Sequence, residues 1–387
     1  MVFNHSYQRG AFALKICIVS PNFSGGGAER VAVNLANYYS EKGADVTIAV
    51  FRAIGPYKNS VSTKIKIFEA KVTKTWYWPF DLVPFFKANR FDLILSVIRS
   101  SNIYVGLASL FSPKSYLIFR EASTMHGLSF FSTGFFKSLV FKLLIFCTYP
   151  LADKIIANSS DTQKDLIRKC FLRKKNMVVI GNPILSTKFQ ALAEEEIGHP
   201  WLSKKKTILA VGRLHHLKNH EMLISAFFLT KQKLKDIKLL ILGEGEEKAK
   251  LLDLVISKGI EDSVDFVEFQ SNPYPFYRKA DLFVHTARWE GFGNVLVEAM
   301  ACGVPVISTN CPGGPKEILE NGKYGDLVEI DDIETLSYLM LKNLLYPNNS
   351  KIKAAKEKAF DFRIDRIAKM YIEPYVIDKS REKAHIV

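Results

Sequence analysis

Residues 288–305 read RWEGFGNVLVEAMACGVP, a run that predicts a tight turn followed by a helix. Asn294 is a favourable N-cap residue, and the apolar residues after it recur at helical spacing. Gly303 and Pro305 are typical of a helix end. The N–H groups of residues 292–295 would then lie at the positive end of the helix without partners inside it. They form a potential anion site.

Two glutamates flank this turn, Glu290 before it and Glu298 one turn inside the helix, on the same face as Asn294. Carboxylates accept hydrogen bonds from hydroxyl groups, whereas backbone N–H groups bind phosphate. The pattern therefore predicts a ligand that carries both phosphates and sugar hydroxyls. The alternatives are that Glu298 is an ordinary solvated carboxylate and that Glu290 forms a structural pair with Arg288.

Around this segment, short apolar runs alternate with helical patterns. Strands are expected at residues 15–20, 45–51, 92–97, 116–119, 154–158, 177–180, 207–211, 238–242, 264–267, 281–285 and 304–308. Continuous apolar strands between helices are typical of parallel sheets that are covered on both faces. The sequence therefore predicts an α/β protein with two Rossmann-like, doubly wound domains that face each other across a cleft.

The domain boundaries follow from breaks in this alternation. Gly-Asn-Pro at 181–183 ends the first half, and the polar, acidic residues 193–200 read as a linker. We expect domains at 1–190 and 191–362. Residues 363–387 show helical spacing and are expected to cross back to the first domain.

The composition sets further limits. The chain has 387 residues, 48% of them hydrophobic, which is enough for two large cores. Its five cysteines are scattered and odd in number, so neither a disulfide framework nor a zinc site is expected. We see no secretory signal and no apolar run of membrane-spanning length, and we expect a cytoplasmic protein.

The net charge of +14 is unevenly distributed. Residues 1–190 carry 25 Lys and Arg against 10 Asp and Glu, a net charge of +15, whereas the remainder carries −1. A basic half is suited to nucleic acid or to an anionic membrane surface. The aromatic runs 75–87 and 130–146 combine rings with Lys, as interfacial segments do, and no nucleic-acid-binding module is recognisable. We therefore expect a membrane surface and no nucleic acid as a partner. The alternative for 130–146 is a helix packed in the core.

Further glycine-rich or charged segments follow expected strands, where a doubly wound domain binds its ligands. They are SGGGAER at 24–30, Gly212-Arg213-Leu214 with Lys218, and Gly243-Glu244-Gly245. Arg213 and Lys218 could clamp a diphosphate, and glycines let the backbone approach a ligand closely. The spacing is neither a dinucleotide fingerprint nor a P-loop. The alternatives are surface cations for Arg213 and Lys218, and a purely steric turn at 25–27.

Together these motifs resemble the family-four retaining glycosyltransferases, which have the two-domain B-type fold. The resemblance spans roughly residues 14–375. It is carried by GGAERV at 26–31, GRL at 212–214, KN at 218–219, GEG at 243–245 and EGFGNVLVEA at 290–299.

The resemblance implies a role for each matching residue. Arg213 and Lys218 would neutralise the donor diphosphate, and Glu290 would contact the transferred sugar. Glu298 would hold the donor ribose. The remaining donor-site positions are the N–H groups of Phe292, Gly293 and Asn294 for phosphate and sugar, Gly243 and Gly245 beside the nucleoside, and Gly26 and Gly27 beside the phosphate and acceptor.

One segment departs from the family pattern. Related enzymes that make lipid-linked glycans often carry Ser-Glu-His-Ser after the fourth strand, whereas this chain reads REASTMH at 120–126. Glu121 matches the glutamate and is a catalytic candidate on this resemblance, but Ala122 stands in the histidine place. His126 is a candidate substitute, and a structural histidine is the alternative.

The implied activity is metal-independent transfer, with retention, of a hexose or N-acetylhexosamine. The donor would be a nucleotide-diphosphate sugar, UDP-linked by family frequency, and the acceptor a growing lipid-linked glycan. No cofactor is expected, and the place of action would be the cytoplasmic face of the inner membrane. The alternatives are an epimerase or glycan phosphorylase on the same fold, or a basic binding scaffold without activity.

Overall fold

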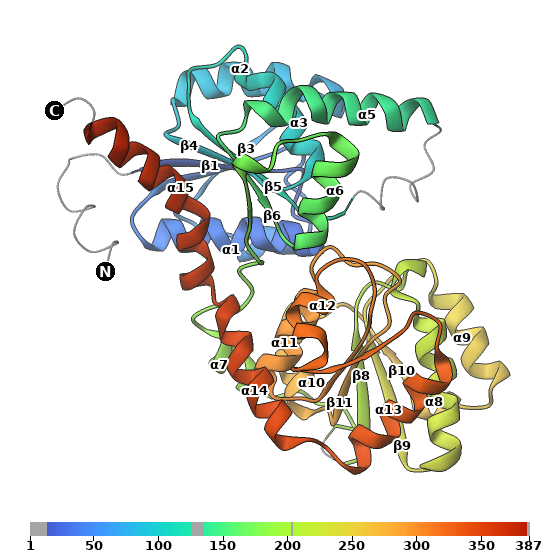
Figure 1. Ribbon diagram of the computed structural model, residues 1–387. Coiled ribbons are helices and arrows are strands. Elements are labelled where there is room, and N and C mark those ends of the chain that lie inside the picture. The colour runs from blue at the N-terminus through green and yellow to red at the C-terminus, as the bar shows by residue number, and fades with distance from the viewer. Residues whose placement is uncertain (1–13, 125–134, 203, 385–387) are drawn as a thin grey trace.

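The computed structural model describes residues 14–124, 135–202 and 204–384, which form two α/β lobes (Figure 1). Lobe 1 holds a seven-stranded parallel sheet in the order β3-β2-β1-β4-β5-β6-β7. Its strands are β1 (Lys15–Ser20), β2 (Asp45–Val50), β3 (Lys66–Glu69), β4 (Leu93–Ser96), β5 (Tyr116–Glu121), β6 (Lys154–Ala157) and β7 (Met177–Val179). Its helices are α1 (Gly27–Glu41), α2 (Trp78–Asn89), α3 (Arg99–Ser109), α5 (Phe135–Thr148) and α6 (Ser160–Cys170).

Lobe 2 holds a six-stranded parallel sheet in the order β10-β9-β8-β11-β12-β13. Its strands are β8 (Lys206–Val211), β9 (Ile237–Leu242), β10 (Val264–Val267), β11 (Leu282–His285), β12 (Val306–Thr309) and β13 (Asp326–Val328). The helices that follow lobe 1 are α7 (Phe189–Glu194), α8 (His220–Lys233), α9 (Lys248–Ser257), α10 (Tyr274–Lys279), α11 (Asn294–Cys302), α12 (Pro315–Ile318), α13 (Ile333–Leu345), α14 (Asn349–Ala359) and α15 (Ile364–Ala384). The expected fold class is confirmed.

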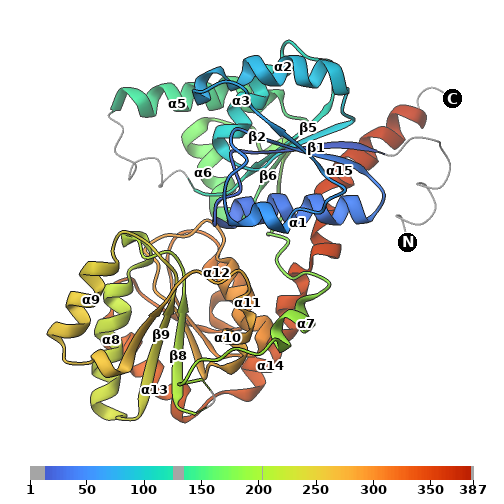
Figure 2. The same ribbon diagram turned by 180° about the vertical axis from the view of Figure 1, so that it is seen from behind.

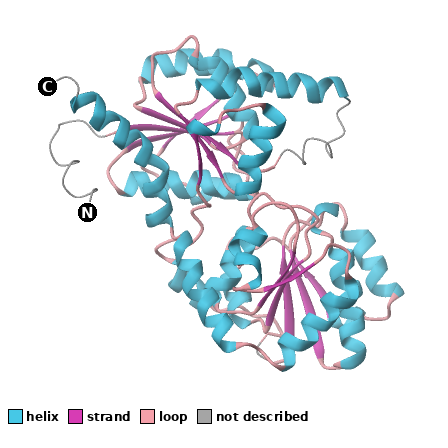
Figure 3. Cartoon of the chain, viewed as in Figure 1, coloured by secondary structure: helices cyan, strands magenta, loops and turns pink. Residues whose placement is uncertain are grey.

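Helices cover both faces of each sheet (Figure 3). Alternate side chains of β1 accordingly enter different apolar clusters. Ile16 and Ile18 pack towards α1 and α15, whereas Cys17 and Val19 pack towards α2, α3 and α5. Because both faces are buried, the strands read as continuous apolar runs rather than as alternating ones.

The strand order reverses beside β1 in lobe 1 and beside β8 in lobe 2. Open parallel sheets bind ligands outside the carboxyl ends of the strands at such a reversal. The loops after β1 and β8 are therefore the ones that the fold delivers to the space between the lobes, as Figure 2 shows from the reverse side.

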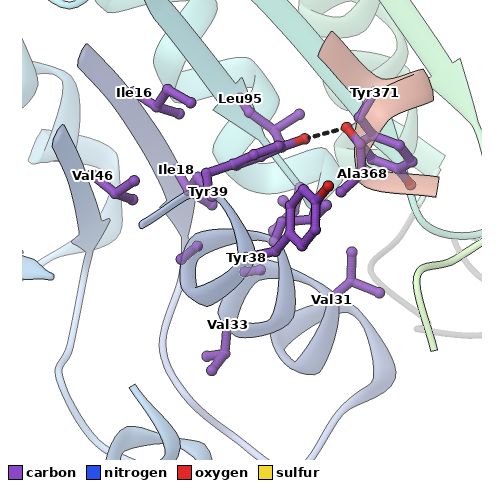
Figure 4. Packing of buried hydrophobic residues seen from close by; sticks show 14 of the residues in the cluster. Ile16, Ile18, Val31, Val33, Tyr38, Tyr39, Val46, Leu95, Ala368 and Tyr371 are labelled. Atoms are coloured by element: carbon purple, nitrogen blue, oxygen red, sulfur yellow. Dashed lines mark hydrogen bonds between the residues drawn. The ribbon is translucent and has the colours of Figure 1, made fainter. Parts of the chain in front are cut away.

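The C-terminal helix α15 completes the core of lobe 1 rather than that of lobe 2. Ile367, Ala368 and Tyr371 are buried in the same apolar cluster as β1 and α1. The hydroxyl of Tyr39 donates a hydrogen bond of 2.8 Å to the carbonyl oxygen of Ala368 (Figure 4). The chain therefore returns to its first lobe after building the second.

Two segments cross between the lobes side by side. The N–H of Ile184 donates to the carbonyl oxygen of Phe362 at 2.9 Å, and the N–H of Ile364 donates to that of Leu185 at 2.9 Å. Ile184 and the residues of α7 already pack in the core of lobe 2. The crossing therefore precedes the stretch 193–200 that the sequence indicates as a linker.

No helix in the described part of the chain combines the length and the apolar character that a bilayer span requires.

We expect Ile367→Ala to lower the free energy of unfolding of lobe 1 by about 2–5 kcal/mol, because it opens a cavity beneath α15. The control is Glu373→Ala on the exposed face of the same helix, which should change stability by less than about 0.5 kcal/mol. Urea titration of both variants measures this. Equal stability of the two variants would show that α15 does not support the lobe 1 core.

Candidate functional site

The candidate site is a cleft between the lobes with two adjoining chambers, of about 420 Å³ and about 930 Å³. Both chambers are lined by residues 25–28 of lobe 1 and by Gly212, Arg213, Asn294 and Val295 of lobe 2. The segments picked out from the sequence on glycine and charge thus converge on one space.

The turn and helix expected at residues 288–305 are present, and the N-terminus of α11 borders both chambers. Gly293, with a φ of 100°, is the N-cap, in a left-handed conformation that favours glycine. The predicted N-cap at Asn294 is therefore wrong by one residue. Its side chain instead accepts a hydrogen bond of 2.8 Å from Asn182.

The lobes approach each other closely at two glycines. A Cβ on Gly27 would lie 2.9 Å from Nδ2 of Asn294, and a Cβ on Gly291 would lie 2.2 Å from the carbonyl oxygen of Ala122. Gly26 is the N-cap of α1 and borders the same space. The N-termini of α1 and α11 therefore meet across the cleft, and two helix dipoles favour negative charge there.

Glu290 lies in a buried hydrogen-bonded cluster. It accepts hydrogen bonds from Nζ of Lys218 and, at 3.0 Å, from Nε2 of His285. Burial alone would raise the pKa of Glu290, but the charge of Lys218 and the bond from His285 outweigh it and hold that pKa well below its ordinary value. Burial lowers the pKa of His285, although the hydrogen bond to Glu290 acts in the opposite direction. Arg288 pairs with Asp331, which excludes the alternative pairing with Glu290 in this structure.

Arg213 lies exposed on the turn after β8, and no ion pair to it is present in the described residues. Nε2 of His220, a buried residue at the start of α8, lies 3.3 Å from the Arg213 carbonyl oxygen. Gly243 has a φ of 146°, and a Cβ there would lie 2.0 Å from the carbonyl oxygen of Gly212. The loop that carries Gly243 and Gly245 therefore packs directly against the arginine turn and holds the cation at the cleft.

Glu298 is 1% exposed, so the alternative of a solvated carboxylate is wrong. Arg30 of α1 donates to its Oε1 at 2.6 Å, and Tyr277 donates to its Oε2 at 3.1 Å. A second guanidinium nitrogen of Arg30 donates to Tyr274 at 2.9 Å. This ion pair joins lobe 1 to lobe 2 at the wall of the larger chamber.

Glu121 is fully buried in lobe 1, where Arg99 binds both of its oxygens, at 3.1 and 2.9 Å. Tyr149 donates to the same carboxylate at 2.6 Å. Burial raises the pKa of Tyr149 well above its ordinary value, so it remains a donor. Arg99 also donates to the carbonyl oxygen of Ser123 on the cleft wall, at 2.7 Å. Glu121 lines neither chamber of the cleft, whereas its neighbours Arg120 and Ala122 line the smaller one. Its catalytic role stays a prediction.

His126 lies outside the described residues. Sequence reasoning missed other members of the site. Arg30 belongs to the recognised GGAERV run, and His285 is a polar residue at the carboxyl end of a strand, which is an available signal. Arg120 and Asn182, which line the smaller chamber, carried no such signal in isolation.

The arrangement suits an anionic ligand with hydroxyl groups. One wall offers Arg213, Lys218 and the N–H groups of α11, whereas the carboxylates Glu290 and Glu298 can accept from hydroxyls. Among the described residues, no group of three or more His, Cys, Asp or Glu side chains is placed to hold a metal ion.

Two family models match the chain, Glycosyltransferase Family 4 over residues 25–185 and Glycosyl transferases group 1 over residues 193–359. N-acetylgalactosamine-N,N'-diacetylbacillosaminyl-diphospho-undecaprenol 4-alpha-N-acetylgalactosaminyltransferase of Campylobacter jejuni is 34% identical over 284 residues, which cover 71% of this chain and 74% of the relative. The amylovoran biosynthesis glycosyltransferase AmsD of Erwinia amylovora is 30% identical over 301 residues, 77% of this chain and 81% of the relative. Anabaena Alr3699/HepE, solved with UDP and glucose, shares the fold with a TM-score of 0.76 at 20% identity, covering 94% of this chain and 99% of that one.

We expect His220 to make stability pH-dependent. Burial lowers its pKa from 6.5 to about 4 in the folded protein. Between these values the unfolded chain takes up a proton that the folded chain does not, so the free energy of unfolding falls by up to about 3 kcal/mol as the pH drops from 7 to 4. His220→Gln should flatten this slope, and His216→Gln, at an exposed position, should not. Urea unfolding at several pH values measures it; identical slopes in wild type and His220→Gln would contradict it.

Proposed function

The chain belongs to the family-four glycosyltransferases, and from this premise we propose that it transfers a hexose or N-acetylhexosamine from a UDP-sugar to a lipid-linked glycan. The observation that carries the proposal is the shared chamber wall formed by Arg213 and the N-terminus of α11. Family membership favours this activity over the epimerase, phosphorylase and scaffold alternatives.

In the proposed arrangement the donor spans the two chambers. The larger chamber has Glu298, Gly243 and Gly245 on its walls and suits the nucleoside, whose ribose hydroxyls would donate to Glu298. Each carboxylate oxygen can accept more than one hydrogen bond, so Glu298 keeps acceptor capacity beside Arg30 and Tyr277. The diphosphate then lies where the chambers adjoin, and the sugar enters the smaller chamber, beside Glu290.

The reaction that we propose proceeds on one face of the sugar. The acceptor hydroxyl oxygen bonds to the anomeric carbon as the bond from that carbon to the β-phosphate oxygen breaks. Because attack and departure occur on the same face, the configuration is retained, and the hydroxyl proton passes to the departing diphosphate. Arg213, Lys218 and the α11 dipole stabilise the negative charge that develops on the leaving group, and this requires neither metal nor cofactor.

The acceptor proposal rests on the relatives. The name of the Campylobacter relative includes a diphospho-undecaprenol-linked sugar, which is a lipid-linked acceptor. We propose the same class of acceptor for this chain.

We expect Arg213→Met to reduce kcat by about 10²–10³-fold, because the leaving diphosphate loses a fixed cation. The control is Arg278→Met, an exposed arginine of lobe 2 that lines neither chamber of the cleft. Turnover is measured with a UDP-sugar and a polyprenyl-diphosphate-linked glycan. Near-normal turnover in Arg213→Met would count against the site.

The ribose contact has its own test. Wild type should bind UDP more tightly than 2′-deoxy-UDP, because a buried carboxylate left without its hydroxyl partner is costly. Glu298→Gln should lose most of this preference, even if its overall affinity also falls. Calorimetric titration with both nucleotides measures the preference. An unchanged preference in Glu298→Gln would remove Glu298 from the ribose site.

We also propose that lobe 1 docks on an anionic membrane at the cytoplasmic face. Helices α2, α3 and α5 lie on the side of lobe 1 away from lobe 2 (Figures 1 and 2). α5 buries Ile145 in the core but leaves Leu139, Leu143 and Phe146 exposed at helical spacing, so neither sequence interpretation of this run is complete by itself. Elsewhere on the lobe, Trp76 and Phe80 are also exposed.

A strained aromatic residue lies at the end of the neighbouring helix α6. Phe171 is 79% exposed and has a φ of 56°, which is costly for a bulky residue. The exposed basic residues 173–175 follow it after one buried residue, Leu172. Rings that enter the interface beside cations that attract anionic lipid are the chemistry of a peripheral membrane contact.

We expect Leu139→Gln/Leu143→Gln/Phe171→Ser to bind anionic vesicles at least about tenfold more weakly, because three apolar side chains no longer enter the interface. A matched triple variant of lobe 2, with Leu252→Gln, Ile256→Gln and Tyr346→Ser at comparably exposed positions, should bind as wild type does. Co-sedimentation with phosphatidylglycerol vesicles measures both. Failure of wild type to sediment at low salt, or equal loss in the two triples, would refute the docking surface.

A further inference from the structure

Arg120 of β5 is a buried cation in the wall of the smaller chamber, and it has no carboxylate partner among the described residues. It is 1% exposed. A buried guanidinium without a counter-ion is costly, so a fold that keeps one calls for an explanation.

The guanidinium is held by three neutral acceptors. Its Nε donates to the hydroxyl of Tyr371 at 3.0 Å, one terminal nitrogen donates to the carbonyl oxygen of Val97 at 2.9 Å, and the other donates to Oδ1 of Asn182 at 2.6 Å. Nδ2 of Asn182 then donates to Oδ1 of Asn294 at 2.8 Å. A chain of hydrogen bonds thus runs from β5, through the crossing segment, to the first residue of α11.

These hydrogen bonds have a fixed order of donors and acceptors. Arg carries only donors, so Asn182 must turn its carbonyl oxygen towards Arg120 and its NH₂ group towards Asn294. Asn294 must then offer its own oxygen to Asn182, which leaves its NH₂ group facing Gly27, where a Cβ would lie 2.9 Å from that nitrogen. The two ends of an amide have nearly the same shape, so packing alone would not select this orientation.

We propose that Arg120 is a positioning residue that fixes Asn294 as a hydrogen-bond donor to the donor diphosphate. The NH₂ group joins the N–H groups of the α11 N-terminus, so that the anion meets donors alone at this point. The inference rests on the proposed function, since it needs a nucleoside diphosphate in the cleft. It adds a residue that acts through Asn182 and Asn294 and so determines which end of an amide the substrate meets.

Asn182→Asp separates this role from a merely structural one. The new carboxylate gives Arg120 a counter-ion, so the melting temperature should stay the same or rise. A carboxylate only accepts hydrogen bonds, so Asn294 must turn round, donate to that carboxylate and present its oxygen to the diphosphate. We expect at least tenfold weaker binding of UDP with an unimpaired fold, and a raised KM for the UDP-sugar. Asn182→Ala, which leaves Asn294 free to rotate, should lose no more than about threefold.

A double-mutant cycle distinguishes amide orientation from simple cancellation of the Arg120 charge. If Asn182→Asp acts through the Asn294 amide, it should add little to the loss of UDP binding already caused by Asn294→Ala. If its full effect persists in the Asn294→Ala background, or if Asn182→Asp binds UDP as wild type does, the inference is overturned. A lowered melting temperature in proportion to the lost affinity would also overturn it. Failure of wild type to bind any nucleoside diphosphate would instead refute the proposed function itself, and this inference with it.

Discussion

The site depends on two glycine-containing turns that let the lobes approach each other closely across the cleft. Gly27, at the start of α1, meets the side chain of Asn294, and Gly291 meets the backbone of Ala122. Both turns follow strands at which the order of a sheet reverses, so the fold delivers two helix N-termini to one space. A side chain at either glycine would hold the lobes apart and separate the N–H donors of α11 from the anion that they are placed to bind. The close contacts at Gly27 and Gly291 are therefore needed to keep the charged groups of both lobes around the same space.

The charged side chains of the cleft are of two kinds, those in ion pairs and those without a carboxylate partner in the described chain. Arg30 with Glu298 and Lys218 with Glu290 are paired across short distances, and each pair fixes a carboxylate that a sugar or ribose hydroxyl can use. Removing one partner of such a pair would leave the other as a buried charge without a counter-ion. Arg213, by contrast, has no carboxylate partner in the described chain, and neither has Arg120. Under the proposed function, the donor diphosphate would compensate cations that have no carboxylate partner, and it would not need to break either pair.

The sequence predicts what is local and misses what is long-range. β1 has the expected bounds because a strand buried on both faces reads as an apolar run. β10 also has its expected bounds, although it is a partly buried strand at a sheet edge. β3 and β13 lack that signal, since both are short strands at sheet edges and β3 is largely exposed. The sequence motifs likewise identified turns that the structure brings together at the cleft. They could not show that Glu298 is paired with a residue 268 positions away, or that the matched position Glu121 lies behind the cleft wall, because burial and partner depend on the packed lobes.

The long-range contacts also link the arrangement of the lobes to the polarity of the site. Arg120 touches Tyr371 of the returning helix α15 on one side and Asn182 of the crossing segment on the other. The two crossing segments are hydrogen-bonded to each other at Ile184 and Phe362, so a hinge motion there moves the residues next to Asn182. If the lobes part, Asn182 cannot remain bonded both to Arg120 in lobe 1 and to Asn294 in lobe 2. Under the Arg120 proposal, the cleft would therefore present the NH₂ group of Asn294 to the anion only while the lobes meet.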